Sequence, residues 1–392
     1  MTETNFKHTD LGLIPHDWEV KTIGDIAEYR RGSFPQPYGL PEWYGGVDAM
    51  PFVQVADVGD DFRLNQTTKQ TISKKAQEYS VFVPKNSVLV TLQGSIGRVA
   101  ITQYDSYVDR TLAIFQHYNI PMANNYFAHQ LSKKFAIERE KAPGGIIKTI
   151  TKEAFTEFEL PLPPTLAEQE RIAGALSSID TLIGTLTEQI EKKRHIKQGA
   201  MQQLLTGKKR LAGFTGEWKT CKIKDIVGTI KRGQGLQSKD YVKGNIPVVA
   251  GGKQYAGYHN VANHLCNTIT ISGSGANAGY VALHTVPIFA TDCSVIDEKD
   301  DFVLAFVYFV LLNKQSDIYK LQSGGAQPHI YPKNIEEIVA LFPPTIAEQS
   351  AIAAVLSRMD AEIAALEQKR DKYIAIKSGM MQNLLTGKIR LV

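Results

Sequence analysis

The chain has 392 residues, of which 43% are hydrophobic and 21% are charged, and this composition predicts a soluble globular protein with more than one domain. The longest apolar run, from Phe302 to Leu312, is too short to cross a bilayer, and the N-terminus lacks the charged leader and apolar core of a secretion signal. Three cysteines without CxxC spacing argue against a disulfide framework or a zinc knuckle and fit the cytoplasm, while a net charge of +4 permits a polyanionic partner without requiring one.

Residues 1–160 are expected to form a first globular domain. Short apolar or alternating runs that begin at Ser87 and Val99 predict strands. An apolar helix is predicted from Tyr126 to Glu140. Strands interrupted by turns and followed by one helix indicate a mixed α+β domain.

Residues 161–211 are predicted to form one long helix. Thr165 and Glu168 form a capping box, in which the Thr165 side chain caps the helix and the Glu168 carboxylate reaches back to the amide of the cap residue. Gly207 is expected to adopt the left-handed conformation that ends a helix. Apolar residues at alternating spacings of four and three have the period of a coiled-coil seam. This first seam comprises Ile172, Leu176, Ile179, Ile183, Leu186 and Ile190.

Residues 212–341 are expected to form a second globular domain. Runs that begin at Ile246 and Thr268 predict strands, and the apolar run from Phe302 to Leu312 predicts a buried helix. The order of strands followed by a helix repeats the plan of the first domain.

Residues 342–392 repeat the long helix. Thr345, Glu348 and Gly387 each lie 180 positions after their counterparts, and about half of the aligned positions are identical without a gap. Because caps, seams and stops match at one offset, two seams that bury against each other are favoured over two ordinary core helices. The second seam comprises Ile352, Leu356, Met359, Ile363 and Leu366.

A weaker duplication frames the two globular domains. The sequence around Trp18 recurs around Trp218, and the pair Arg31-Gly32 recurs as Arg232-Gly233. Between these frames the two domains have little sequence in common. Their surfaces are therefore expected to recognise different things.

Motifs that could carry catalysis or hold a cofactor do not fit their context. The glycine run from Gly273 to Gly279 resembles a dinucleotide loop, but a strand-like run follows it instead of a helix whose N-terminus could bind phosphate. Gly94 and Gly97 lie at the matching point of the first domain, which favours a turn shared by both domains. Asp292 and residues 297–299 hint at a magnesium nuclease, although surface charge in a turn explains them more simply. We therefore expect a binding module without a metal, a cofactor or catalytic residues in this chain.

Contacts with DNA are expected from polar loops in both domains. Arg and Lys can bind phosphates or guanine, and Gln and Asn can read adenine. Any one of these residues can equally belong to an ordinary turn, but around two matching frames the set indicates two recognition faces. The candidates in the first domain are Arg30, Arg31, Ser33, Gln93, Ser95, Arg98 and Lys148. Those in the second are Lys231, Arg232, Gln234, Gln237, Lys253, Gln254, Tyr255, Ser274, Asn277, Gln327, His329 and Lys333.

The paired helices, which begin at Pro163 and Pro343 and each run on to Leu-Leu-Thr-Gly-Lys, resemble those of the DNA-specificity subunit of type I restriction-modification systems. The resemblance covers essentially the whole chain. It implies an α+β fold with a pseudo-two-fold duplication, in which target recognition domains at residues 1–160 and 212–341 are separated and joined by an antiparallel coiled coil. Each domain would read one half of a bipartite DNA sequence, and the helices would set the number of unread base pairs between the halves.

The resemblance also implies partners for this chain. Two methyltransferase subunits would bind S-adenosylmethionine and methylate adenine, and restriction subunits, which are motor-nucleases, would use ATP and Mg. This chain would bind no cofactor and would not be an enzyme. Two alternatives stay open, namely a stand-alone DNA nuclease or methyltransferase and a coiled-coil scaffold without DNA affinity.

Overall fold

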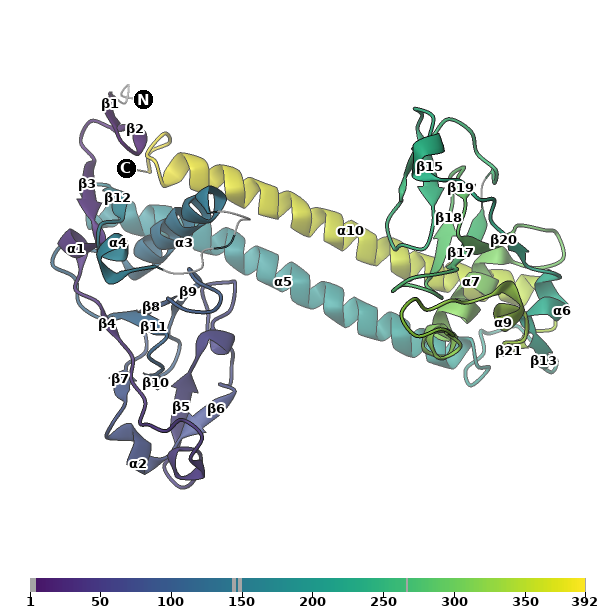
Figure 1. Ribbon diagram of the computed structural model, residues 1–392, viewed down its shortest axis with the longest axis horizontal. Helices are drawn as coiled ribbons and strands as arrows, with labels where there is room; N and C mark the ends of the chain where they lie inside the picture. Colours follow the sequence, from purple (N-terminus) through teal and green to yellow (C-terminus); the bar gives the residue numbers. More distant parts are fainter. Residues whose placement is uncertain (1–4, 143–145, 147–149, 266, 392) are drawn as a thin grey trace. The chain divides into compact units, whose positions relative to one another are not determined.

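The computed structural model describes residues 5–142, 146, 150–265 and 267–391, and the chain falls into two units (Figure 1). Unit 1 comprises Met1–Thr187 and Gln368–Val392, and unit 2 comprises Glu188–Glu367. Two helices of 39 residues, α5 (Leu166–Leu204) and α10 (Ile346–Leu384), confirm the predicted pair of long helices. Each of these helices begins in one unit and ends in the other.

The strands of unit 1 form two larger sheets and two ribbons. The first sheet is antiparallel, in the order β4 (Arg30–Arg31), β11 (Leu112–Phe115), β8 (Val88–Thr91) and β9 (Val99–Ile101). The second has the order β6 (Gln70–Ile72), β5 (Met50–Val53), β10 (Ser106–Val108) and β7 (Val81–Val83), with β5 and β10 parallel. The ribbons pair β1 (Phe6–Thr9) with β2 (Gly12–Pro15), and β3 (Glu19–Thr22) with β12 (Glu159–Leu162).

One helix of 18 residues, α3, and several short helical segments connect the strands of unit 1. They are α1 (Ile23–Ile26), α2 (Lys74–Gln77), α3 (Asn124–Lys141), α4 (Lys152–Thr156) and the 3-10 turns η1 (Pro41–Trp43) and η2 (Val55–Asp57). Helix α3 and strands β8 and β9 confirm the predicted helix and strands of this region. The sheet that contains β5 and β6 lies at the end of the unit away from α5 (Figure 1).

Unit 2 has a similar set of strands and helices. Its main sheet has the order β14 (Lys231–Arg232), β20 (Cys293–Asp297), β17 (Thr268–Ser272) and β18 (Val281–His284). A smaller sheet has the order β16 (Gly257–His259), β15 (Ile246–Val249) and β19 (Phe289–Ala290), and a ribbon pairs β13 (Lys219–Lys222) with β21 (Val339–Phe342). The helices are α6 (Ile223–Val227), η4 (Ser238–Asp240), α7 (Leu304–Asn313), α8 (Gln315–Lys320) and α9 (Pro332–Glu336).

The duplication seen in the sequence extends to the strand order of the two units. In each unit, a two-residue strand that contains an arginine pairs with the second strand of an antiparallel four-stranded sheet. In each, a parallel pair of strands, β5 with β10 or β15 with β19, belongs to the second sheet. The two domains are therefore variants of one α+β fold with different loops.

A separate hydrophobic core in each unit joins the globular domain to both long helices. In unit 1, Phe127 and Phe155 pack in one cluster with Ile172 of α5 and Leu384 of α10. In unit 2, residues of the domain share a cluster with Leu204 of α5, and with Ile352 and Leu356 of α10. A buried Leu or Ile stabilises a fold by roughly 1.5–3 kcal/mol, so these shared cores hold each domain firmly on its helices.

Contacts within each unit show that α5 and α10 run antiparallel there. In unit 1, Lys377 Nζ lies 2.5 Å from an Asp180 carboxylate oxygen. In unit 2, Lys193 pairs with Glu362 at 2.6 Å, and Lys197 pairs with Asp360. In unit 2 the residue number rises along α5 as it falls along α10, and in unit 1 the start of α5 packs in one cluster with the end of α10, so the two helices are antiparallel in both units.

The predicted seam residues are mostly buried. In the first helix all of them are buried except Ile183, which is half-buried, and in the second helix Met359 and Leu366 are half-buried. The Leu-Leu pair at the end of each helix, which the sequence indicated only as a stop, also belongs to the apolar contact surface. Gly207 and Gly387 end the helices with φ of +69° and +70°, which confirms their predicted conformation.

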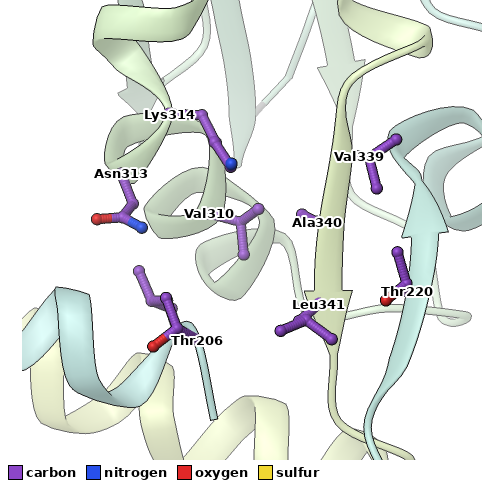
Figure 2. Close-up of a pocket in the computed structure, with 9 residues that line it drawn as sticks. Thr206, Thr220, Val310, Asn313, Lys314, Val339, Ala340 and Leu341 are labelled. Atoms are coloured by element: carbon purple, nitrogen blue, oxygen red, sulfur yellow. The ribbon is translucent and has the colours of Figure 1, made fainter. Parts of the chain in front are cut away.

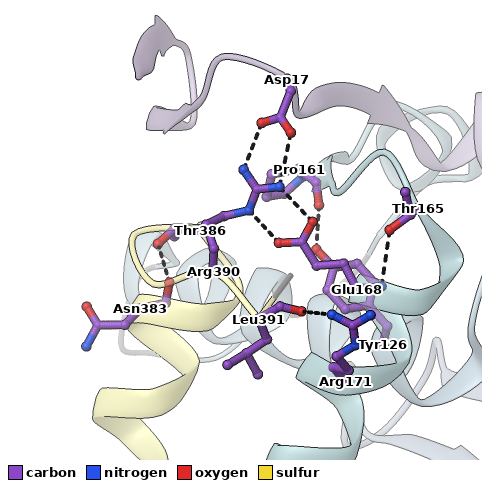
Figure 3. Close-up of polar contacts among 10 residues, drawn as sticks. All are labelled: Asp17, Tyr126, Pro161, Thr165, Glu168, Arg171, Asn383, Thr386, Arg390 and Leu391. Carbon is purple, nitrogen blue, oxygen red and sulfur yellow. Dashed lines mark hydrogen bonds and ion pairs between the residues drawn. The ribbon is translucent and has the colours of Figure 1, made fainter. Parts of the chain in front are cut away.

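The predicted capping boxes form only in part. The Thr165 hydroxyl accepts the Glu168 amide at 3.3 Å, as expected for a cap, and Thr345 does the same for Glu348. The Glu168 carboxylate does not serve the cap as predicted but accepts two hydrogen bonds from Arg390, whose other contacts reach Asp17 (Figure 3). The repeated glutamates therefore bind distant arginines, which a pattern of neighbouring residues does not reveal.

The glutamine that follows each glutamate explains another part of the repeat. Gln169 and Gln349 are both buried, and their side-chain oxygens accept the amides of Ala123 at 2.9 Å and Val303 at 3.1 Å. Ala123 and Val303 are the N-cap residues of α3 and α7. Each glutamine thus satisfies a free amide at the start of a domain helix and docks that helix on α5 or α10.

Candidate nucleic-acid interface

The candidate residues of unit 1 that the structure describes gather at one end of the sheet β4-β11-β8-β9. Strands β4 and β8 run toward this end, and β11 and β9 start from it, because neighbouring strands are antiparallel. Arg31 ends β4, while Gln93 and Ser95 lie in the turn that joins β8 to β9. All three residues are exposed, as is Arg30, whose side chain points to the opposite face of the strand.

The residue after each arginine must be glycine, because the backbone of a neighbouring segment packs closely against it. A Cβ atom at Gly32 would lie 2.0 Å from the carbonyl oxygen of Val108, and one at Gly233 would lie 2.3 Å from that of Thr291. Any side chain there would push the short arginine strand off the sheet. The repeated Arg-Gly pair thus presents an arginine at the same sheet end in both units.

The side chains of two candidate residues of unit 1 form hydrogen bonds with other residues of the same unit. Arg98 donates from Nη1 to the Val58 carbonyl at 3.2 Å and forms an ion pair with Asp60 at 3.3 Å. The Ser33 hydroxyl donates to the Tyr79 carbonyl at 2.8 Å. Both side chains therefore hold loops in place, while Lys148 lies outside the described residues.

Sequence reasoning missed Arg110, which is exposed just before the start of β11. Its guanidinium lies 5.4 Å from the centre of the Tyr38 ring, a distance at which a cation is attracted to an aromatic face. The only signal in the sequence was an arginine directly before an apolar strand. Arg110 adds a second cation near the end of the sheet where Arg31 lies.

The same end of the main sheet in unit 2 carries its candidates. Arg232 ends β14, and Ser274 lies in the turn between β17 and β18. Asp292, which the sequence suggested was only surface charge, lies between them: Oδ1 is 3.2 Å from Arg232 Nη2, and Oδ2 accepts the Ser274 hydroxyl. This carboxylate links one candidate residue at a strand end to another in a turn of the same sheet.

Lys253, Gln254 and Tyr255 lie together in the loop between β15 and β16 and line a small cleft. The Lys253 ammonium is 5.5 Å from the centre of the Tyr280 ring. Thr270 and His284 also line the cleft, and Thr270 Oγ1 and His284 Nε2 are 2.9 Å apart. Burial lowers the pKa of His284 below its ordinary value, which favours the neutral imidazole.

The segment that contains His329 is tied to the turn that contains Ser274. The Ile330 amide donates to the Gly273 carbonyl at 2.9 Å, and the Gly275 amide donates to the Pro328 carbonyl at 3.0 Å. The His329 ring stacks on Tyr331 with centroids 6.3 Å apart. The pairing brings His329 beside Ser274 although 55 positions separate them in the chain.

The other candidates of unit 2 are surface residues. Those that are exposed are Lys231, Gln234, Gln237, Gln327 and Lys333, and Asn277 is half-buried. The backbone amide of Gln234 donates to the Ala290 carbonyl at 3.0 Å, and the residue is exposed to solvent.

The glycine run of unit 2 forms a hairpin turn. It joins β17 to β18, with φ of +81° at Gly275 and +89° at Gly279, and unit 1 has positive φ at Gly94 and Gly97 in its matching turn. Gly97 and Gly279 are also pressed against side chains, Phe135 and Ile330 respectively, so a Cβ would clash in both places. Within the described residues, no three His, Cys, Asp or Glu side chains form a group that could hold a metal ion.

A cleft of about 190 Å³ in unit 2 is lined by none of the candidate residues, and Figure 2 shows the side chains around it. It opens between the end of α5, helix α7 and the β13–β21 ribbon, and Val310 and Leu341 line it. In unit 1 the residue that matches Val310 is Gln130, whose amide donates to the carbonyls of Pro161 and Leu385. Because the cleft lies where unit 2 has Val310 in place of this glutamine and its lining is largely apolar, we attribute it to domain packing.

Comparison with known proteins identifies the family. The model described as the type I restriction modification DNA specificity domain matches residues 15–193 and 215–375. The type I restriction enzyme MjaVIII specificity subunit of Methanocaldococcus jannaschii is 25% identical over 99% of this chain and 97% of its own length. A putative type I specificity subunit of Mycoplasma pneumoniae is 23% identical, over 94% of this chain and 96% of that protein.

A solved structure has the same fold. The crystal structure of a type I restriction-modification S subunit from M. genitalium matches with a TM-score of 0.67 and 20% identity, covering 94% of this chain and 96% of that one. None of the helices in the described residues combines the length and apolarity needed to cross a bilayer. Two copies of the family's domain therefore lie in tandem here, and the chain belongs to the DNA specificity family of type I restriction-modification systems.

Proposed function

We propose that this chain is the specificity subunit of a type I restriction-modification complex and that each globular domain reads one half of a bipartite DNA sequence. The observation that carries the proposal is the repeated frame with unlike loops. Both units present an Arg-Gly pair at the same end of the same sheet. The residues around the arginine differ, so the two domains would read different bases.

The unread spacer between the two half-sites would depend on the length of α5 and α10. Each helix has 39 residues, and ion pairs hold the two helices in register within unit 1 and within unit 2. A slip of one helix along the other by less than a whole repeat would separate these pairs and expose apolar seam residues. The distance between the two reading surfaces would thus be built into the helices.

The chemistry would belong to partner subunits in the cytoplasm. Methyltransferase subunits would supply S-adenosylmethionine and methylate adenine, and restriction subunits would supply ATP-driven translocation and Mg-dependent cleavage. This chain would contribute recognition alone. The described residues agree with that role, because the loops at the sheet ends carry donors and acceptors suited to DNA and the glycine run is a hairpin turn.

The test is to produce the chain with its methyltransferase partner in cells without other methylation and to sequence the modified bases. We expect one bipartite motif with a constant spacer. A continuous motif would contradict reading by two domains. Magnesium-dependent cleavage or methylation by the purified chain alone would support the enzyme alternative, and absence of salt-dependent DNA binding by the complex would support the scaffold alternative.

A further inference from the structure

Arg232 and Arg31 occupy equivalent places but have different neighbours. Arg232 lies opposite Ser294 on β20, as Arg31 lies opposite Ala113 on β11. By the same register, the residue that matches Asp292 in unit 1 is Thr111, which has no charge. Within the part of the chain that the structure describes, no acidic side chain pairs with Arg31, whereas Arg232 Nη2 lies 3.2 Å from Asp292 Oδ1.

The Asp292 carboxylate is held from several sides. Its second oxygen accepts the Ser274 hydroxyl, so both oxygens have donors. Gly273 brings the backbone so close that a Cβ atom there would lie 2.9 Å from Asp292 Oδ1, and a Cβ at Gly251 would lie 2.6 Å from the Ser274 carbonyl oxygen. The carboxylate therefore has little freedom, and the guanidinium that binds it has a preferred orientation.

The pair of Arg232 and Asp292 suits a neutral acceptor better than a phosphate. Its charges cancel, and the carboxylate repels an approaching phosphate, so the pair adds little to sequence-independent affinity. The Arg232 side chain is nevertheless 58% exposed, and a guanidinium has five N–H donors, most of which stay free. A planar fork in a fixed orientation matches two acceptors on one base edge, and guanine presents N7 and O6 in the major groove.

We propose that Arg232 recognises one guanine in the half-site of unit 2, and that Asp292 and Ser274 are positioning residues that orient its guanidinium. Arg31, which lacks such a carboxylate, contacts a phosphate and contributes affinity without specificity. This inference rests on the proposed function. It requires that discrimination at one G·C pair in the half-site of unit 2 depends on Arg232.

The test uses the complex of this chain with its methyltransferase partner and duplexes that carry the methylated motif or one substituted base pair at each position. For Arg232→Lys, which keeps the charge but loses the fork, we expect discrimination at one G·C pair to fall about tenfold or more. Asp292→Asn should lower discrimination at the same pair and also raise affinity for all duplexes, because a negative charge is removed. A role in folding alone would not produce these opposite changes.

Arg31→Ala is the matched variant in unit 1. It should weaken binding to every duplex equally and reduce the salt dependence by about one phosphate contact. Discrimination at the other positions in the half-site of unit 2 reports whether each variant of unit 2 is folded, and if Asp292→Asn fails this check, Arg232→Lys decides.

Three results would overturn the inference: a half-site of unit 2 without a G·C pair, unchanged discrimination in Arg232→Lys, or a uniform loss on all duplexes. Each leaves the proposed function standing as long as the wild-type complex reads a bipartite motif. If the wild-type complex has no such preference, the proposed function itself fails.

Discussion

Arg390 donates hydrogen bonds of 2.5 and 2.8 Å to the two oxygens of the Glu168 carboxylate, which lies 222 positions earlier in the chain (Figure 3). In unit 2, Arg210 makes the same two bonds to Glu348, at 2.8 and 2.7 Å. Both glutamates are almost completely buried, so each carboxylate depends on its arginine for compensation of lost solvation. The repeat thus ties the segment after one long helix to the start of the other in both units.

Replacement of Arg390 by alanine should destabilise unit 1 by about 3 kcal/mol, because a buried carboxylate would lose both hydrogen bonds from its charged partner. The measurement is the free energy of unfolding in urea. Arg370→Ala is the control, because Arg370 pairs with its exposed neighbour Asp371, and its loss should change stability by no more than about 0.5 kcal/mol. Equal effects of the two substitutions would show that the bidentate pair does not stabilise the unit.

The pair in unit 2 predicts a dependence of stability on pH. Hydrogen bonds from the Arg210 guanidinium lower the pKa of Glu348 below its ordinary value of 4.5. The resulting stabilisation is fully present above pH 4.5 and is lost as pH falls through the lower pKa of the folded state. The difference in unfolding free energy between wild type and Arg210→Ala should therefore shrink as the pH is lowered below 4.5. A difference that stays constant with pH would contradict this assignment.

Filling the cleft shown in Figure 2 should stabilise unit 2. Val310→Met would extend a side chain that already lines the cleft, and added apolar burial should raise the unfolding free energy by about 0.5–1 kcal/mol. Val307→Met is the matched control on the same helix: Val307 is fully buried and does not line the cleft, so overpacking should cost about 1–3 kcal/mol. Thermal unfolding of both variants decides, and equal destabilisation would mean that the cleft is not accessible to residue 310.

The long helices were predictable because their signals are local. The seam, the threonine caps and the glycine stops lie within one helix or at its ends, so Gly207 and Gly387 could be assigned from neighbouring residues alone. The role of Glu168 could not, since its partner Arg390 comes near it only when the chain folds. A glutamate at this position can complete either a capping box or a buried ion pair. The tertiary structure determines which of the two forms.

The candidate site was predicted less completely for a similar reason. The Arg-Gly frames indicated where the candidate residues of each unit begin, and the structure places Arg31 and Arg232 at matching strand ends. The sequence indicates Arg98 as a DNA-contact candidate, but in the structure its guanidinium binds Val58 and Asp60 within unit 1. Two-residue strands and long-range pairing leave no periodic pattern, so the neighbours of an exposed loop residue cannot be read from its own segment.

Changing the length of α5 and α10 should change the unread spacer of the DNA motif. Four residues inserted after both Leu186 and Leu366 would lengthen each helix by about 6 Å, or slightly more than one turn. Since DNA rises about 3.4 Å per base pair, the spacer should grow by one or two base pairs while both half-sites stay the same. Methylated bases sequenced from cells with the variant complex give the answer.

Two inserted residues in each helix are the control for this prediction. They rotate the helix by more than half a turn, so the reading surfaces would no longer face the same side of the DNA, and methylation should be lost. Full activity of this variant, or an unchanged spacer in the four-residue variant, would mean that the helices do not measure the distance.

The most direct test of two independent reading domains is exchange of one of them. Residues 15–160 would be replaced by the equivalent segment of a relative whose methylated motif is known, and the exchanged chain would be produced with the methyltransferase partner. Sequencing of methylated DNA should show that one half of the motif has become the relative's, while the other half and the spacer are unchanged. A change in both halves, or a motif identical to the original, would contradict recognition by two separate domains.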